Sequence, residues 1–195
     1  MRTNEVKVEA LLTNAQALLT GHFLLTSGLH SNKYMQCAKV MVNPKDTEII
    51  GRFIADGFEA DNIDIVVAPA MGGILIGYEV ARALGVSSMF TERVEGKMEL
   101  RRGFEIPHGA RVIIIEDVVT TGKSTNEVKV LLESLGANVV GVGSIIDRSG
   151  GVDFGVKFVS TYAPEIETYT KETCPICAAG DLPLIKPGSR VMPKE

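Results

Sequence analysis

The sequence has 195 residues, of which 45% are hydrophobic and 23% charged, a composition typical of a folded globular protein. Twenty basic residues against 24 acidic ones give a net charge of −4, without the basic excess of proteins that bind nucleic-acid backbones. The longest charge-free apolar stretch, residues 65–78, is shorter than the roughly 18 residues of a membrane helix. We therefore expect one domain over residues 1–195, with no nucleic-acid partner and no membrane partner.

The amino terminus is charged from Arg2 onward and lacks the apolar core of a secretory signal, so we expect a cytoplasmic protein. Three cysteines are too few for a disulfide framework. Cys174 and Cys177 lie in a Cys-Pro-Ile-Cys motif, which is half of a zinc knuckle. No second pair of ligands with the spacing of a zinc site is found among the remaining cysteine and the histidines, which are Cys37, His22, His30 and His108. We therefore predict reduced thiols and assign no metal ligand.

Two segments near the amino terminus have the apolar spacing of amphipathic helices, residues 5–19 and residues 46–59. A turn at Thr20-Gly21 is expected to follow the first helix. Asp46 is a plausible N-cap for the second. Both helices are expected to cover a core, because each carries its apolar residues on one side.

Four short, β-branched and mostly apolar runs predict strands that are buried on both faces. Helix-patterned segments separate most of them, so right-handed βαβ units and a mainly parallel sheet are expected, which makes the fold class α/β. The tail from residue 174 has little periodicity and should pack as an irregular cover. The predicted strands are residues 63–68, 111–115, 139–146 and 156–161.

The most informative segment follows the strand 111–115. Glu116 and Asp117 come first, then small hydroxylated residues around Gly122, then a helix to about Leu135. The start of such a helix offers free backbone N–H groups to a phosphate, while adjacent carboxylates accept hydrogen bonds from a vicinal diol. This combination indicates a ribose 5-phosphate site. The residues concerned are Glu116, Asp117, Val118, Val119, Thr120, Thr121, Gly122, Lys123 and Ser124.

Two other interpretations of this segment are weaker. An ordinary capped helix explains the hydroxyls but leaves both carboxylates without a purpose. A nucleoside-triphosphate P-loop matches at residues 122–124 but fails on spacing, because the glycine required five residues earlier is Asp117.

Residues 116–125 resemble the phosphoribosyl-diphosphate (PRPP) signature of the type I phosphoribosyltransferases. The resemblance to the orotate phosphoribosyltransferases extends over roughly residues 18–148, and the closing residues 186–190 are similar to shorter bacterial members. It implies a central, mainly parallel sheet flanked by helices, with a small hood from the terminal segments. The other segments that carry the resemblance are residues 26–35, 68–73, 93–103 and 147–148.

The resemblance also implies an activity. Members of this family transfer phosphoribosyl from PRPP to orotate and form orotidine 5′-monophosphate and pyrophosphate in pyrimidine biosynthesis. It implies Mg²⁺ carried by PRPP, and a homodimer. The rival interpretations are a phosphoribosyltransferase for another base, and a PRPP-sensing regulator without chemistry. A neutral purine needs no guanidinium such as Arg148, and the net charge and the basic loop disfavour the regulator.

Residues 93–103 follow a strand and form a candidate lid, because they carry several basic side chains and a glycine at each shoulder. By resemblance, Arg93 and Lys97 match the loop arginine and the catalytic lysine, which reach the neighbouring subunit's site and stabilise departing pyrophosphate. The alternative is a solvated charged hairpin. Val94 and Glu99 stand where relatives have further basic residues, so the contributions of the other basic residues stay open. These other residues are Arg101 and Arg102.

The turn after the strand 63–68 precedes a predicted helix at 74–84 and is assigned to pyrophosphate through its backbone N–H groups. Alternatively, its glycines serve only close packing of helix on strand. Relatives carry an aromatic residue and a lysine at the positions of Met71 and Gly72, so only the backbone contribution is carried over. The loop residues are Ala70, Met71, Gly72 and Gly73.

Orotate carries a carboxylate on a planar ring, which favours recognition by a guanidinium. Arg148, just past the strand 139–146, is the candidate, and its alternative is an ion pair with Asp147 or Asp153. By resemblance, Thr120 contacts the base, and Tyr34 and Met35 flank it. Tyr34 and Met35 could equally be core residues of a short strand. Thr26 replaces a lysine of the relatives and receives no role.

Overall fold

The computed structural model describes residues 3–25 and 27–187 of the chain. Its larger sheet has six strands in the order β5-β4-β3-β6-β7-β8. All neighbouring strands are parallel except β4 and β5, which form an antiparallel hairpin. The predicted, mainly parallel sheet is therefore confirmed. The strands are β3 (Ile65–Pro69), β4 (Ser87–Val94), β5 (Lys97–Leu100), β6 (Arg111–Val119), β7 (Asn138–Asp147) and β8 (Lys157–Tyr162).

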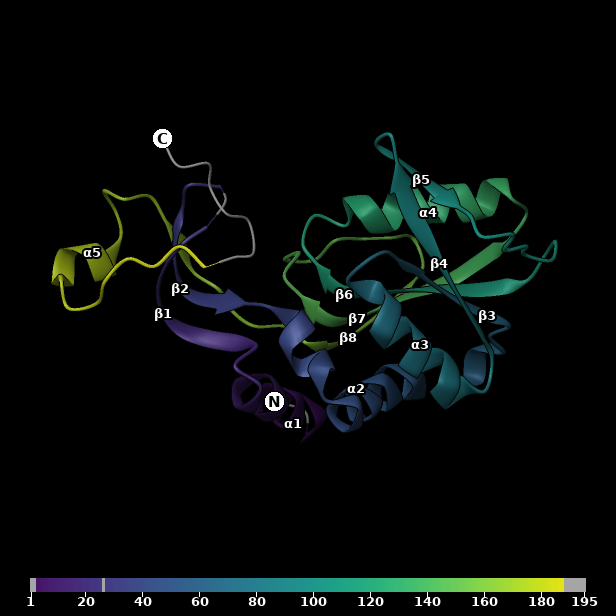
Figure 1. Cartoon of the computed structure of the whole chain (residues 1–195), viewed down its shortest axis with the longest axis horizontal. Coiled ribbons are helices and arrows are strands. Elements are labelled where there is room, and N and C mark those ends of the chain that lie inside the picture. Colours follow the sequence, from purple (N-terminus) through teal and green to yellow (C-terminus); the bar gives the residue numbers. More distant parts are fainter. Residues whose placement is uncertain (1–2, 26, 188–195) are drawn as a thin grey trace.

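Helices cover both faces of this sheet (Figure 1). Successive residues of β6 alternate between the two faces, so Ile113 and Ile115 belong to one apolar cluster while Val112 and Ile114 belong to another. The first cluster includes side chains of α1 (Thr3–Asn14), α2 (Pro44–Asp56) and α3 (Gly73–Leu84), and the second those of α4 (Lys123–Ser134). Short 3₁₀ helices occupy Cys37–Val42 and Glu59–Asp61. Within residues 3–25 and 27–187, no helix is long and apolar enough to cross a membrane.

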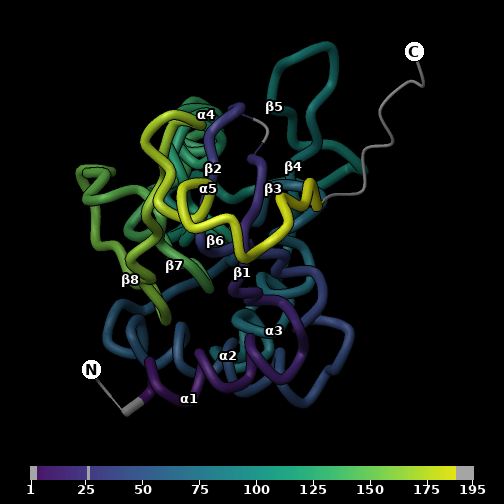
Figure 2. The backbone as a smooth tube through the Cα atoms, turned by 90° about the vertical axis from the view of Figure 1, so that its left-hand side faces the viewer, coloured from purple at the N-terminus to yellow at the C-terminus, as the bar shows by residue number. Residues whose placement is uncertain are grey.

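A second, three-stranded sheet forms a hood at one end of the molecule (Figure 1). Its antiparallel strands are β1 (Leu18–Leu24), β2 (His30–Met35) and β9 (Thr168–Tyr169). The one-turn helix α5 (Pro175–Ala179) follows, and Ile185 then bridges to Phe23 of β1. Figure 2 shows this C-terminal segment beside the β1–β2 hairpin. The predicted hood from the terminal segments is thus confirmed. Residues 188–190, part of the resemblance at the carboxyl end, lie outside the described residues.

The predicted helix 5–19 is too long. Helix α1 ends at Asn14, because Gln16 takes a left-handed φ of 53°, and Leu18 and Leu19 open strand β1 instead. The expected turn at Thr20-Gly21 lies inside β1, and the chain reverses at Ser27-Gly28, where Gly28 has a φ of 83°. The helical spacing of apolar residues continues by chance from α1 into β1. The pairing that makes β1 a strand depends on residues beyond the segment 5–19.

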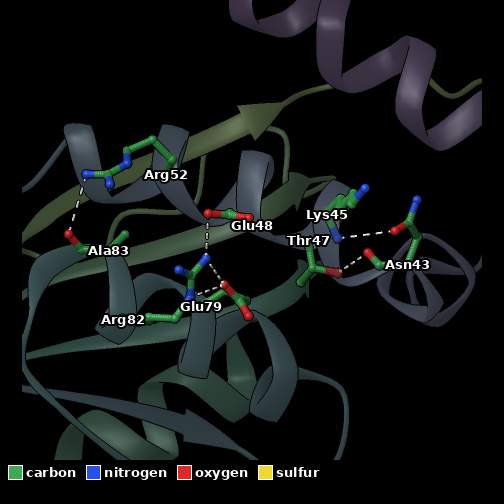
Figure 3. A network of polar contacts seen from close by, with 8 residues as sticks. All are labelled: Asn43, Lys45, Thr47, Glu48, Arg52, Glu79, Arg82 and Ala83. Carbon is green, nitrogen blue, oxygen red and sulfur yellow. Dashed lines mark hydrogen bonds and ion pairs between the residues drawn. The ribbon is translucent and has the colours of Figure 1, made fainter.

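Helix α2 begins earlier than predicted, and its N-cap is Asn43 rather than Asp46 (Figure 3). The Asn43 side-chain oxygen accepts a hydrogen bond from the Lys45 N–H at 3.2 Å, and Pro44 occupies the first helical position, where a missing N–H costs nothing. Asp46 accepts a bond from the Asn43 side-chain amide at 2.9 Å. The capping oxygen thus comes from the residue before the proline.

Helix α2 also packs on α3 through polar contacts at the surface (Figure 3). Arg82 of α3 pairs with Glu48 of α2 at 2.9 Å and with Glu79 of its own helix at 2.7 Å. Arg52 approaches the Ala83 carbonyl oxygen at 3.5 Å. Because Arg82 and Glu48 are about half exposed, the apolar cluster beneath these contacts contributes more to the packing of the two helices.

Candidate active site

Strand β6 runs to Val119, so Glu116 and Asp117 are the last polar residues of a buried strand rather than the start of a loop. Predicting its end at residue 115 was therefore wrong, because pairing with β7 continues to Asp147. The connection to α4 is only three residues long and ends at Gly122, which caps the helix with a φ of 72°. A Cβ on Gly122 would lie 2.9 Å from the ring of Phe154. Both the backbone angle and the space there require glycine.

A small hollow of about 40 Å³ lies where β6 passes into α4. The first backbone N–H groups of this 12-residue helix lie there, at the positive end of the helix dipole. The Thr121 hydroxyl accepts a hydrogen bond from the Lys123 N–H at 3.3 Å, which fixes the turn. This geometry suits the phosphate of a ribose 5-phosphate. The lining residues are Glu116, Val118, Val119, Thr120, Thr121, Gly122, Lys123, Ser124 and Thr125.

The acidic pair beside this hollow is incompletely hydrogen-bonded. One carboxylate oxygen of Glu116 is buried and has no hydrogen-bond partner among the described residues. Burial, and secondarily Asp117, raises the pKa of Glu116 to about 8. Burial also raises the pKa of Asp117, against a 2.9 Å bond from the Val118 N–H that lowers it. Such an acceptor is well suited to hydroxyl donors of a ligand, because an unpaired buried oxygen is costly.

The turn between β3 and α3 contacts the acidic pair. A Cβ on Gly72 would lie 2.6 Å from an Asp117 carboxylate oxygen, and a Cβ on Gly73 would lie 2.7 Å from the Ile115 carbonyl oxygen. Close packing, the alternative considered for these glycines, is therefore present. The packing also brings the turn 70–73 against the end of β6. The two segments assigned to pyrophosphate and to PRPP are thus neighbours at one edge of the sheet, as expected for carboxyl ends of parallel strands.

Arg148 lies at the same edge. Its backbone N–H donates to the Val119 carbonyl at 2.8 Å, and its positive charge counteracts the effects of burial and of Asp117, which raise the pKa of the Cys37 thiol. The alternative ion pairs do not form among the described residues. Asp147 instead accepts bonds from the Ser149 N–H at 2.8 Å and from the Ser149 hydroxyl at 2.6 Å. Asp153 likewise accepts a bond from the Gly155 N–H.

The basic segment 93–103 is a β-hairpin rather than a loop, because strands β4 and β5 pair around a turn at Glu95-Gly96. Arg93 forms an ion pair with Glu127 of α4 and donates to the Gly96 carbonyl at 2.7 Å. Lys97 is exposed and lines a groove beside α4, outside the hollow. The fold therefore does not bring Arg93 and Lys97 to the hollow of their own chain.

The remaining predicted base contacts lie in different places. Thr120 is exposed on the turn after β6. Tyr34 and Met35 lie at the end of β2, so the short strand considered for them is present. Met35 packs on the larger apolar cluster, while the Tyr34 ring lies 5.8 Å from the ring of Phe23. Tyr34 thus belongs to the hood, and Met35 to the junction between hood and core.

The fold also assembles a group of side chains that we did not assign from the sequence. His22, His30, Cys174 and Cys177 converge in the hood, with one nitrogen or sulfur of each within 4.8 Å of all the others. Assigning no metal ligand overlooked this cluster, because about 140 residues separate the histidine pair from the cysteine pair. The signal in the sequence was the Cys-Pro-Ile-Cys motif. Its partner ligands, the two histidines, are distant in sequence and not near the motif.

Comparison with known proteins places these features in a family. A family model described as "Phosphoribosyl transferase domain" matches residues 42–167. The orotate phosphoribosyltransferase of Caldanaerobacter subterraneus is 52% identical over 185 residues, covering 94% of this chain and 97% of that protein. The enzyme of the same name from Thermotoga maritima is 48% identical over 184 residues, with coverages of 94% and 98%.

Solved structures agree at the level of the fold. Orotate phosphoribosyltransferase from Aeropyrum pernix superposes with a TM-score of 0.69 at 23% identity, covering 80% of this chain and 93% of that chain. The Mycobacterium tuberculosis enzyme in complex with PRPP superposes with a TM-score of 0.65 at 20% identity, covering 82% and 96%. From these similarities and the geometry above, the chain belongs to the phosphoribosyltransferase family, among the orotate phosphoribosyltransferases.

Proposed function

We propose that the chain transfers the phosphoribosyl group of PRPP to orotate, giving orotidine 5′-monophosphate and pyrophosphate in pyrimidine biosynthesis. The observation that carries this proposal is the unpaired buried oxygen of Glu116 beside Asp117, next to the N–H groups that open α4. Carboxylates for a ribose diol and a cradle for its 5-phosphate stand together at one sheet edge. The names of the relatives supply the base.

Displacement of pyrophosphate from the anomeric carbon builds positive charge on the sugar and negative charge on the leaving group. Glu116 and Asp117 orient the ribose through its hydroxyls, and their negative charge favours the cationic sugar once Glu116, whose pKa is raised to about 8, has released its proton on substrate binding. The N–H groups of residues 71–73 receive the pyrophosphate oxygens, whereas the Ala70 N–H already donates to the Thr91 carbonyl at 2.8 Å. Mg²⁺ arrives with the diphosphate as part of the substrate. Each group acts on charge that grows during the reaction, which is the condition for catalysis.

Arg148 is proposed to bind the orotate carboxylate. It lies at the same sheet edge as Asp117, and neither aspartate nearby pairs with it. A guanidinium with free donors suits a carboxylate through two parallel hydrogen bonds. Thr120 and Tyr34 are proposed to complete the base site from the turn and from the hood, and Met35 to support the ring next to Tyr34.

A homodimer is proposed, with the hairpin 93–103 reaching the neighbouring active site. An exposed apolar stripe supports it, because Met71 in the turn before α3 and Leu75 and Tyr78 on α3 are 83%, 55% and 60% exposed. A second copy covering this stripe would bury it, and Lys97 lines a groove other than the hollow of its own chain. A cytoplasmic location and a single domain over residues 1–195 stay predictions.

A spectrophotometric assay tests the activity, with PRPP, Mg²⁺ and either orotate, adenine, guanine or uracil offered in parallel. We expect consumption of orotate alone. Consumption of another base would reassign the base site, and PRPP binding without turnover of any base would favour a regulator. An Asp117→Asn variant serves as the matched control, because it keeps the shape of the site and removes the charge.

A further inference from the structure

The cluster in the hood has the geometry of a metal site. His22 Nε2 lies 2.9 Å from His30 Nδ1, 3.5 Å from Cys174 Sγ and 3.6 Å from Cys177 Sγ, and the last sulfur is 3.3 Å from His30 Nδ1. One imidazole nitrogen has a single in-plane site for a proton or a lone pair, so it serves one hydrogen-bond partner and not three. Four ligand-type atoms that surround one point are better explained by a cation between them.

The distances agree with zinc. Bonds of about 2.0–2.1 Å to nitrogen and 2.3 Å to sulfur place the corners of a tetrahedron about 3.3–3.8 Å apart. The four distances above fall within about half an ångström of that range. Two thiolates and two imidazoles favour Zn²⁺ over Mg²⁺ and Ca²⁺, which prefer oxygen. Because the protein fills all four positions, such a site is structural rather than catalytic.

The surroundings of the cluster also fit. The other ring nitrogen of His22 lies 3.3 Å from the Leu182 carbonyl oxygen, so this Nδ1–H donates there and leaves Nε2 free to bind a metal. His22, His30 and Cys174 are only 2–3% exposed. An extra residue in β1 between Thr20 and Phe23 breaks the alternation of the strand, which buries His22 and Phe23 together.

The hood has little apolar core, so a bound metal ion would add stability that packing does not supply. The side chains of Leu182, Leu184 and Ile185 are 47%, 44% and 50% exposed, although this segment hydrogen-bonds to β1. Strand β9 pairs with β2 at two positions only. Small sheets without a hydrophobic face are marginal in water, and small units commonly use disulfides or metals instead.

We propose that His22, His30, Cys174 and Cys177 bind a structural zinc ion that fastens residues 168–187 onto the β1–β2 hairpin. The metal would hold β2 at His30, four residues before Tyr34 on the same strand. This inference stands apart from the proposed function, since it concerns the hood and is tested without turnover.

The test is the metal content of the full chain, purified in reductant without a metal-affinity tag or chelator and measured by mass spectrometry of the elements. We expect close to one zinc per chain. Cys174→Ser and His22→Gln should each lose it. Cys37→Ser and His108→Gln are matched controls outside the cluster and should keep it.

A second measurement covers variants that fail to fold. Zinc is removed from the wild-type chain with a mercurial and a chelator, and Co²⁺ is added in its place. Visible absorption typical of tetrahedral cobalt thiolate would support the site, and so would loss of protease resistance in residues 168–187 while zinc is absent. A chain without zinc, iron in place of zinc, a Cys174–Cys177 disulfide, or octahedral cobalt would overturn it.

Discussion

The six-stranded sheet buries β6 and β7 between helices, whereas the hood buries few apolar side chains of its own. In the sheet, Ile113, Ile114 and Ile115 are fully buried by apolar neighbours. In the hood, the buried side chains include His22, His30 and Ser31. The difference shows where each part obtains its rigidity: the sheet from packing over a wide area, and the hood from a few specific polar and sulfur contacts.

This difference bears on the site, because one edge of the packed sheet holds Glu116, Asp117 and Arg148 in fixed positions. Groups that stabilise developing charge must be fixed before the reaction begins, and a close-packed core does this. The hood carries Tyr34, which is proposed to contact the base. We therefore assign sugar and phosphate chemistry to the sheet edge and part of the base selection to the hood.

The largest expected effect lies in the basic hairpin at one edge of the six-stranded sheet. Lys97→Ala should lower kcat by ~10²–10³, about 2.7–4 kcal/mol, because its ammonium acts on charge that grows on pyrophosphate. Orotate affinity should change far less. Steady-state kinetics and calorimetry measure the two quantities. An unchanged kcat would place the catalytic cation elsewhere, with Arg101 the next candidate.

Mixing subunits shows whether the hairpin serves the neighbouring chain. Lys97→Ala chains mixed with Asp117→Asn chains should regain activity, because one of the two sites in each heterodimer then combines an intact hairpin with an intact acidic pair. Each variant alone supplies the control. No recovery would mean that the hairpin acts on its own subunit, against the position of Lys97 beside α4.

Substitutions at Arg148 test whether the sheet edge, and not the hood alone, binds orotate. Arg148→Ala should weaken orotate binding by about 1.5–3 kcal/mol, roughly 10- to 150-fold, while PRPP affinity changes less than about threefold. Arg148→Lys should rescue only partly, since an ammonium lacks the two-point geometry. Calorimetry with each ligand measures this. Equal weakening of both ligands, or a lower Tm with orotate affinity intact, would make Arg148 a structural residue.

Two glycines with left-handed backbone angles, one next to the six-stranded sheet and one in the hood, allow the packing of these two regions to be compared. Gly122 has a φ of 72° and Phe154 close by. Gly28 in the hood has a φ of 83° and, among the described residues other than its two chain neighbours, no heavy atom within 4 Å of the position that a Cβ would take. Gly28→Ala should cost about 1–2 kcal/mol from backbone strain alone. Gly122→Ala should cost ~1–3 kcal/mol more, because it also overpacks. Denaturant unfolding measures both, and equal costs would contradict the packing argument.

The sequence was most informative where local pattern and environment agree. Strands β3, β7 and β8 were predicted to within two residues at each end, because their runs are short and mostly apolar or β-branched. Strands β3 and β7 are buried as expected, whereas the edge strand β8 is buried only at Thr161 and Tyr162. The acidic pair was found because two carboxylates have no role in an ordinary buried strand. Features that depend on distant pairing were missed. The start of β1 was predicted as helix. The hairpin of β4 and β5 pairs locally, and it matches the charged hairpin that was the alternative for residues 93–103.

The hood cluster shows the limit most clearly. His22 and Cys174 are 152 residues apart, so only the folded chain reveals that they meet. The N-cap of α2 was a different kind of error, since the deciding signal, Pro44 after Asn43, was local and visible. The exposed stripe at Met71, Leu75 and Tyr78 was not visible as such, because exposure depends on which face of α3 meets the sheet.

The raised pKa of Glu116 predicts a pH-dependent stability. An unfolded glutamate titrates at about 4.3, and the folded one at about 8, so the native state binds more protons between these values. The contribution of Glu116 is fully present below about pH 4 and is lost as the pH rises to about 8. Glu116→Gln should therefore flatten this part of the Tm-versus-pH curve. Parallel Tm-versus-pH curves for the wild-type and Glu116→Gln proteins would contradict the raised pKa of Glu116.

The most direct test of the sugar site is calorimetric titration with PRPP between pH 6 and pH 8. The ribose hydroxyls need a charged acceptor, so binding to the wild-type chain should release a proton from Glu116, and its Kd should fall up to about tenfold per pH unit. Glu116→Gln should bind more weakly at pH 8 and follow only the titration of PRPP itself. Equal Kd values with equal pH dependence in both proteins would contradict the placement of the ribose at Glu116.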